Sequence, residues 1–407
     1  MKKEQKRGVF ALAGCLILFL VLGCGRIPVQ AAQEDRAGTD HTIGEERTLL
    51  EMGADEVKQQ MIDQLDMDSI DTYIQGQDKE SSLSFSTLVS ELMSGGDTKL
   101  LQQIGSYTRD LLLGEIDNNR ELLIFMIALA FTFALLRNFS SVFQNSYVSQ
   151  LCFLLVYVEL MVLLMKSFAV VQELLTGTLD QIVEFMKVLL PVFCMSMVFS
   201  NGTTTASGFY EMAFLIIFLV QWVMRYLLTP LIQIYVVMQF VNYTLEGEKF
   251  AKMCELLEGG IVWTMKLTVT VVLGLNVVQG LVNPAIDRLK MSSLSKTVSM
   301  IPGFGNAAGS IGELLVGTGM VIKNSVGVAA MLILVILVLV PILKIFVLTF
   351  LYKLAAAVVE PVTDKRIAGS MNGVFRGSLL AAKVMLTSLF LFFLTIAMIT
   401  AASGMSV

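Results

Sequence analysis

A lone acidic residue inside an apolar segment is the first candidate for chemistry in this sequence. Glu159 is the single charged residue in the run from 148 to 165. Carboxylates at membrane depth are costly, so they face protein or water and commonly mark ion or proton pathways. The position of Glu159 therefore predicts an ion or proton site, with a hydrogen-bonded structural carboxyl as the alternative.

Two pairs of prolines could place unwound backbone inside a membrane. Pro191 and Pro302 are 111 residues apart, and so are Pro230 and Pro341, in a chain that has 7 prolines. Proline removes a backbone donor and interrupts helices, and the unwound backbone of a broken membrane helix can bind ions or line a passage. We therefore take these prolines as candidate helix breaks and pathway positions, with turns into interfacial helices as the alternative.

A glycine-rich run surrounds Pro302. Residues 300–321 lack the Gly-Lys-Ser/Thr of a nucleotide-binding loop, which excludes that kind of site. Gly305 and Gly309 form a GxxxG pair, and this spacing lets two helices approach closely. We expect this run, like the short apolar run 188–199, to be re-entrant or interfacial.

Catalytic motifs are missing from the sequence. It contains no His-Glu-x-x-His, no nucleophile elbow and no paired acids of the hydrolase type, and His41 is its one histidine. Its 5 cysteines form neither a disulfide framework nor a metal-ligand spacing. We predict a protein that is not an enzyme and has no cofactor or metal.

Composition indicates a membrane protein. Apolar residues make up 55% and charged residues 15% of the 407 residues, against roughly 45–50% and about 25% in soluble domains. An ordinary soluble enzyme is therefore excluded. Residues 34–117 hold 19 acidic and 6 basic residues, whereas 118–407 hold 14 acidic and 18 basic. The acidic part is expected to be a separate region that faces water.

The N-terminus reads as a secretory leader. Lysines and an arginine precede an apolar core at 9–22, and small residues predict cleavage after Ala31, which gives a signal peptide of residues 1–31. Lipid attachment to Cys24 and an uncleaved anchor are the alternatives. Residues 32–118 then lie outside the cytosol, and their helical periodicity predicts short amphipathic helices that pack as a cap or dock a partner.

We expect an all-α, polytopic bundle of seven to nine membrane-spanning helices. Two leading helices and an amphipathic helix occupy 119–180, followed by two repeats, 181–282 and 283–407, that match at the 111-residue offset. The eight most apolar runs are 122–136, 148–165, 209–224, 226–243, 261–281, 325–341, 342–359 and 379–402. The 36 residues 324–359 exceed one span, so we expect two spans there. One long kinked helix is the alternative.

The number of spans decides how the repeats are related. Three spans in each repeat would invert the second copy relative to the first, an arrangement that often builds a transport pathway. If residues 324–359 form one helix, each repeat has two spans and the copies are parallel. With the N-terminal region outside, nine basic residues fall in cytosolic loops and four in outside loops, which agrees with the positive-inside rule.

Three blocks of sequence resemble a known family. These are FSTLVSELMSGG, TTTASGFYEMAFLIIFLVQ and the long block that starts IPGFGNAAGSIGELLVGTGMVIKNSVGVAAML. The chain resembles the stage III sporulation protein AE family over most of its length. The resemblance implies a protein of the mother-cell (outer forespore) membrane whose N-terminal region lies in the intermembrane space. It also implies partners in a multi-protein channel complex, but no catalytic residues.

Two functional hypotheses follow. The first is a non-enzymatic membrane subunit of a sporulation channel, in contact with other membrane and intermembrane-space subunits and with the bilayer, and with no nucleic-acid partner. The second is a stand-alone secondary transporter, which the apparent inverted duplication, the proline pairs and Glu159 favour.

Overall fold

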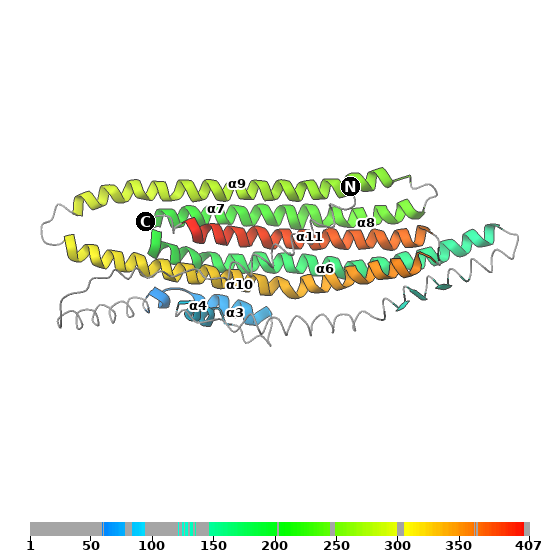
Figure 1. The fold of residues 1–407 in the computed structure, drawn as a ribbon, viewed down its shortest axis with the longest axis horizontal. Coiled ribbons are helices and arrows are strands. Elements are labelled where there is room, and N and C mark those ends of the chain that lie inside the picture. Colours follow the sequence, from blue (N-terminus) through cyan, green and yellow to red (C-terminus); the bar gives the residue numbers. More distant parts are fainter. Residues whose placement is uncertain are drawn as a thin grey trace, which may run out of the picture. The chain divides into compact units, whose positions relative to one another are not determined.

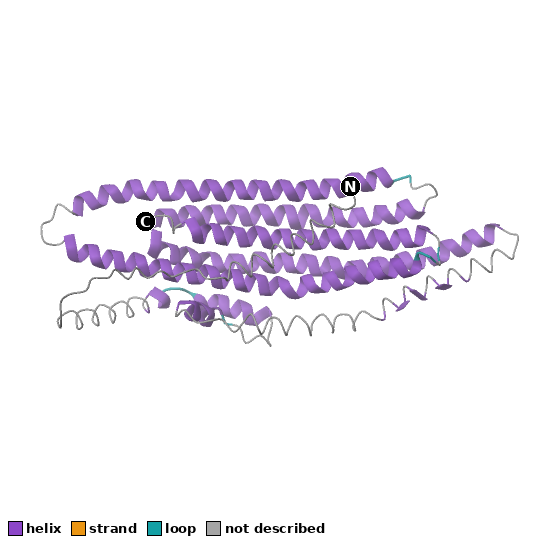
Figure 2. Cartoon of the chain, in the orientation of Figure 1, coloured by secondary structure: helices purple, strands orange, loops and turns teal. Residues whose placement is uncertain are grey.

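The computed structural model describes residues 61–77, 84–93, 146–201, 203–244, 249–298, 305–361 and 365–402, with residues 59 and 363 and a few positions between 121 and 135. The chain divides into two units, Met1–Gly53 and Ala54–Val407, and the described residues all belong to the second. Every regular element in this part of the chain is a helix (Figure 2).

Nine helical elements follow one another in the described residues. They are α3 (Met67–Gln77), α4 (Phe85–Met93), α6 (Ser146–Asn201), α7 (Thr203–Gln221), the π-helix η1 (Trp222–Leu228), α8 (Thr229–Thr244), α9 (Ala251–Val298), α10 (Gly305–Val359) and α11 (Lys365–Ala402).

The long helices form an elongated bundle around α11 (Figure 1). Helix α11 packs against α6, α8, α9 and α10, while α10 also packs on α6, and α9 on α7 and α8. Helices α6, α9 and α11 run in one direction, and α7–η1–α8 and α10 run in the other. We call the end where α6 begins the first end of the bundle, and the end where α6 stops and α7 starts the second end.

Five helical segments are long and apolar enough to cross a membrane. They are Tyr157–Ser200, Ala206–Thr244, Ala251–Val278, Gly317–Val359 and Lys365–Thr400, with mean hydropathies between 1.8 and 3.2. The described residues thus confirm the all-α membrane fold. The 44-residue segment is about 66 Å long, so it exceeds a hydrocarbon core of about 30 Å.

Two of the expected helix breaks do not occur. Pro191 lies inside α6 and Pro341 inside α10. An interior proline removes one helical hydrogen bond, whereas a full break among apolar residues would leave several backbone groups without partners. The run 188–199 is therefore the end of a long helix rather than a re-entrant segment, and residues 324–359 form one helix, the alternative we had kept.

The third proline follows a local change of helix type. Pro230 is the second residue of α8, directly after η1. The backbone N–H and the Oγ1 hydroxyl of Thr229 both donate to the Met224 carbonyl, the hydroxyl at 3.0 Å. This wider turn leads the chain into the proline without a break. The expected spans 209–224 and 226–243 are consequently one rod.

This change in span number also changes the relation between the two repeats. The segment around Pro230 lies in α7–η1–α8 and its match around Pro341 lies in α10, and both rods run from the second end to the first (Figure 1). The first proposed repeat contains a long hairpin of α7–η1–α8 with α9, and the second contains a hairpin of α10 with α11. The inverted arrangement we expected is therefore replaced by a parallel one, while common descent of the two hairpins stays a prediction.

The described part of the N-terminal region is a pair of short helices. The Asp71 carboxylate accepts hydrogen bonds from the Ser84 and Ser86 hydroxyls at 3.1 and 2.7 Å and from the Phe85 backbone N–H, so it caps the start of α4. Helix α3 packs on α6 and α4 packs on α10. Short helices with buried apolar faces were expected here.

Several predictions fall outside the described residues. These are the leader 1–31 with Ala31 and Cys24, His41, most of the span 122–136, and Pro302. Gly305 and Gly309 lie in the first turns of α10, but their surroundings are outside the described side chains.

Candidate functional site

Polar side chains follow the buried faces of α11 from one end of the bundle to the other, and we call them the polar seam. From the first end to the second, its members are Tyr157, Ser370, Gln239, Tyr235, Glu258, Arg376, Gln172, Ser378, Asn276, Thr395, Lys323 and Thr400. They come from all the long rods, so the seam exists only in the folded bundle.

At the first end, the seam ties α6 to α8 and α11. The buried Tyr157 hydroxyl donates to the Phe240 carbonyl at 2.9 Å and lies 2.8 Å from the Ser370 hydroxyl. About three turns further along α6, the Ser167 hydroxyl lies 2.5 Å from the Tyr352 hydroxyl and joins α6 to α10. Such pairings satisfy polar groups that would otherwise be buried alone.

The next layer contains a carboxylate and a guanidinium, Glu258 and Arg376. The Tyr235 hydroxyl donates to Glu258 Oε2 at 3.2 Å, and Gln239 Nε2 donates to the Tyr235 hydroxyl at 3.0 Å. Arg376 Nη1 lies 3.8 Å from the same Glu258 oxygen, and the Glu258 and Arg376 side chains are 23% and 45% exposed. A carboxylate held between a phenol and a guanidinium is suited to ion pairing or to proton exchange with the surface.

At the second end, the seam holds a buried amine. Asn276 Nδ2 donates to Thr395 Oγ1 at 3.3 Å, so α9 is joined to α11. Lys323 is 1% exposed and its Nζ donates to the Thr400 carbonyl at 3.0 Å. Thr400 lies in the last turn of α11, where the carbonyl ends of the helix favour a cation.

Three polar groups of the seam have no hydrogen-bond partner within the described structure. They are both amide atoms of Gln172, the Ser378 hydroxyl and the Asn276 carbonyl oxygen. Phe168 of α6 lies beside Gly377 of α11. Gln172 is one turn after Phe168 on α6, and Ser378 directly follows Gly377 on α11. Both polar residues therefore lie at the contact between α6 and α11. Buried groups of this kind are where proteins bind water.

The structure separates the predicted site residues. Glu159 is exposed on α6 and does not join the seam, although its neighbours Tyr157 and Leu160 are buried. Pro191 and Pro230 are exposed and Pro341 is partly buried, on three different rods. These prolines therefore do not meet at one place in the bundle, and a pathway role for them stays a prediction.

Sequence reasoning missed Glu258 and a line of glycines. Glu258 was placed in a charged loop, but it lies one turn before the apolar run that starts at 261. Gly369, Gly373 and Gly377 follow a GxxxGxxxG spacing and let α11 approach α8, where added Cβ atoms would lie 2.4, 2.9 and 2.2 Å from Tyr243, Gln239 and Val236. That spacing was readable in the sequence.

Among the described side chains, no three His, Cys, Asp or Glu residues gather as metal ligands would. Among the described side chains, Cys194 and Cys254 are unpaired thiols. The chemistry that the described site can offer is hydrogen bonding, ion pairing and hydration.

An elongated α-helical membrane bundle with a polar seam defines a polytopic membrane protein. The family model for stage III sporulation protein AE matches residues 83–403. The chain belongs to that family. A curated relative, stage III sporulation protein AE of Bacillus subtilis (strain 168), is 23% identical over 296 residues, which cover 72% of this chain and 74% of the relative. No solved structure matches the chain.

Proposed function

We propose that this sporulation membrane protein is a non-enzymatic subunit of a multi-protein channel that links mother cell and forespore. The observation that carries the proposal is the extent of the family match, because residues 83–403 include α4 and every long helix of the bundle. The shared feature of the family is therefore the membrane bundle itself. A bundle whose rods are joined by buried hydrogen bonds toward both ends suits a fixed scaffold in a membrane complex.

Placement follows from the same proposal. The bundle lies in the mother-cell (outer forespore) membrane, with α3, α4 and the acidic N-terminal region in the intermembrane space. The outer face of α3 supports this, since Asp68, Ser69, Thr72 and Gln75 are exposed. Its partners are then other membrane and intermembrane-space subunits of the channel.

Deletion in the native sporulating host tests the proposal. The deletion strain should complete engulfment and then lose expression from a late forespore reporter, and the wild-type chain supplied in trans should restore it. The variant Gly274→Ala is a matched control, since an added Cβ at Gly274 meets no atom within 4 Å. Normal late forespore transcription in the deletion strain would contradict the proposal.

A stand-alone secondary transporter is the second candidate. The observation that favours it is the Tyr235–Glu258–Arg376 layer beside polar groups without partners, Gln172 and Ser378. Purified full-length chain in liposomes should then carry protons or another ion down an imposed gradient. Glu258→Gln should abolish that flux, and Glu159→Gln tests the acid predicted from sequence. If no gradient drives flux through the wild-type chain, this candidate is removed.

A further inference from the structure

Charged residues on α6 occur at every seventh position over four intervals. They are Glu159, Lys166, Glu173, Asp180 and Lys187, and we call them the charged stripe. Seven residues are close to two helical turns, so these side chains leave α6 on one face. The 28-residue interval is about 42 Å long. The stripe is therefore longer than a hydrocarbon core of about 30 Å.

The stripe points away from the bundle interior. Glu159, Lys166, Glu173 and Lys187 are exposed. Asp180 is 45% exposed and binds Arg225, whose Nε lies 3.2 and 3.3 Å from the two carboxylate oxygens. Arg225 comes from η1, so the π-helical turn faces the stripe at its fourth residue, Asp180. Segments of this kind often occur at functional sites.

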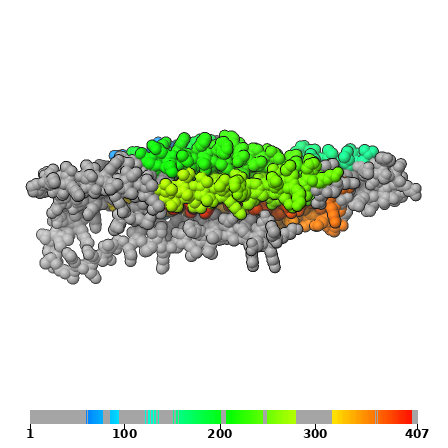
Figure 3. Space-filling model, turned by 90° about the horizontal axis from the view of Figure 1, so that it is seen from above, coloured from blue at the N-terminus to red at the C-terminus, as the bar shows by residue number. Residues whose placement is uncertain are grey.

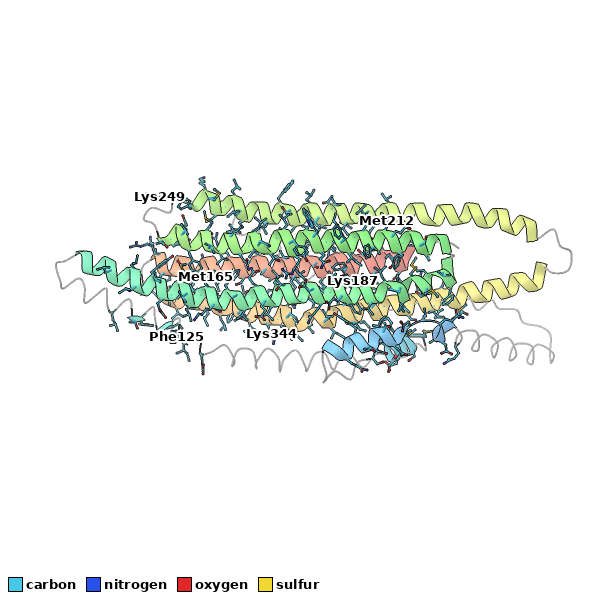
Figure 4. The ribbon with its side chains drawn as sticks, turned by 180° about the vertical axis from the view of Figure 1, so that it is seen from behind. Phe125, Met165, Lys187, Met212, Lys249 and Lys344 are labelled. Atoms are coloured by element: carbon cyan, nitrogen blue, oxygen red, sulfur yellow. The ribbon has the colours of Figure 1, made fainter. Side chains whose placement is uncertain are left out.

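A second polar element lies beside the stripe. The Tyr73 hydroxyl of α3 donates to the carbonyl of Gln181 at 2.8 Å, and its ring lies 6.2 Å from that of Phe185. Gln181 directly follows Asp180, so α3 borders the stripe between Asp180 and Lys187. Figure 4 shows Lys187 on α6 close to the α3–α4 pair. Since the outer face of α3 carries exposed Asp68 and Thr72, hydrocarbon does not suit this side of the bundle.

Other faces of the bundle differ strongly from the stripe. Along α7 and η1, exposed aromatic residues recur at every fourth position: Tyr210, Phe214, Phe218, Trp222 and Tyr226. Helix α9 exposes Trp263, Leu267 and Val271. Figure 3 shows the faces of α7–α8 and α9 side by side. These exposed apolar side chains suit contact with lipid chains, and the exposed charges within 210–226 and 263–271 are Glu211 beside Tyr210 and Lys266 beside Leu267.

Wherever the bilayer crosses the bundle, it includes part of the charged face of α6. A span needs about 20 residues, and every window of that length within Tyr157–Ser200 contains at least two charged residues. Charged side chains at membrane depth face protein or a water-filled space, because contact with hydrocarbon is unfavourable. The stripe therefore does not face lipid.

We infer that the charged stripe, with the outer face of α3, lines a water-filled passage that several copies of this chain enclose. The inference rests on the proposed channel function and names the face that serves it. Copies related by an axis along the bundle place the same residue at the same level, which gives rings of Lys166, Glu173 and Lys187. Rings of like charge need water between them, and such rings line many ion-conducting pores.

Cysteine labelling tests whether the stripe is hydrated. Lys166→Cys, Glu173→Cys and Lys187→Cys are made one at a time in a full-length chain whose native cysteines are replaced by serine. Membranes are then treated with a charged methanethiosulfonate. All three thiols should react at least about tenfold faster than Phe218→Cys and Trp263→Cys, because only hydrated thiols ionise to the reactive thiolate. The controls lie at exposed positions of the apolar faces.

Equal, slow reaction at stripe and control positions would overturn the inference, whether lipid or a partner protein covers the stripe. A second experiment tests whether several copies assemble. A bifunctional thiol reagent should crosslink the Lys166→Cys variant into dimers and larger species. A hydrated stripe in a chain that stays monomeric would also overturn it. The labelling result and the deletion result can be told apart. If labelling is slow but the deletion blocks late forespore expression, only the passage is refuted. If labelling is fast but the deletion has no effect, only the proposed function is refuted.

Discussion

The tightest surroundings among the described glycines, those of Gly377, predict the effect of one added methyl group. A Cβ at Gly377 would lie 2.2 Å from Cγ2 of Val236 and 3.4 Å from the Phe168 ring. Carbon atoms in favourable contact are about 3.5–4.0 Å apart. Val236 is fully buried, and a β-branched side chain in a helix has one preferred rotamer. Gly377→Ala therefore forces α8 and α11 apart.

The size of the effect follows from comparison with a second alanine variant. Gly274→Ala gains the same helix propensity, but its Cβ meets no atom within 4 Å. The difference between the two variants therefore isolates overpacking, which costs about 1–3 kcal/mol in protein cores. The unfolding equilibrium of Gly377→Ala should accordingly be roughly 5- to 150-fold less favourable to the native state than that of Gly274→Ala.

Denaturant titration of the purified chain in detergent, followed by tryptophan fluorescence, measures this difference. A double variant with Val236→Ala serves as a further check, since removing the contacted methyl group should recover part of the loss caused by Gly377→Ala. The packing argument fails if Gly377→Ala and Gly274→Ala unfold at the same denaturant concentration. It also fails if Val236→Ala adds its full cost to that of Gly377→Ala.

Three further predictions concern the two ends of the bundle and its topology. Tyr157→Phe should cost about 0.5–1.5 kcal/mol of stability in the same titration, because the Phe240 carbonyl loses its hydroxyl donor; an unchanged midpoint would contradict this. Lys323→Met should lower the stability by less than about 1.5 kcal/mol, whereas Lys323→Ala should cost about 2–5 kcal/mol because it leaves a cavity. Equal unfolding midpoints for the two variants would show that the amine of Lys323, and not the volume of its side chain, matters. Cysteines introduced at Thr203 and Ser295 should react with an impermeant reagent from the same side of the membrane, since α7 begins and α9 ends at the second end of the bundle. Labelling of the two positions from opposite sides would exclude the parallel arrangement.

The sequence allowed the fold class to be predicted because long apolar runs have few stable alternatives. Backbone groups in hydrocarbon must be paired within the chain, and helices do this locally. Helix α4 was equally readable, since Phe85, Leu88 and Val89 share one buried face. In contrast, helix continuity depends on packing. Pro191 and Pro341 were taken as breaks, but the neighbouring rods support helices that continue through both.

The polar seam was hidden from sequence analysis for a different reason. Its pairs join positions far apart in the chain, such as Asn276 with Thr395, and a single sequence carries no signal for such contacts. Glu159 was noticed because one acid stood among apolar residues, yet the structure puts it on the surface and places Glu258 within the seam. A charge inside an apolar run therefore indicates exposure to protein or water, but not which of the two.

The position of each hairpin explains how the proposed repeats differ. At the 111-residue offset, Gly369 and Gly377 of α11 match Glu258 and Lys266 of α9. Helix α11 is surrounded by four rods and needs small residues where α8 approaches it, whereas α9 lies at the edge and keeps charged side chains at the matching positions. If the hairpins descend from one unit, the central copy has glycines that allow close packing where the outer copy has charged side chains. The outer copy then supplied the carboxylate that pairs with Arg376.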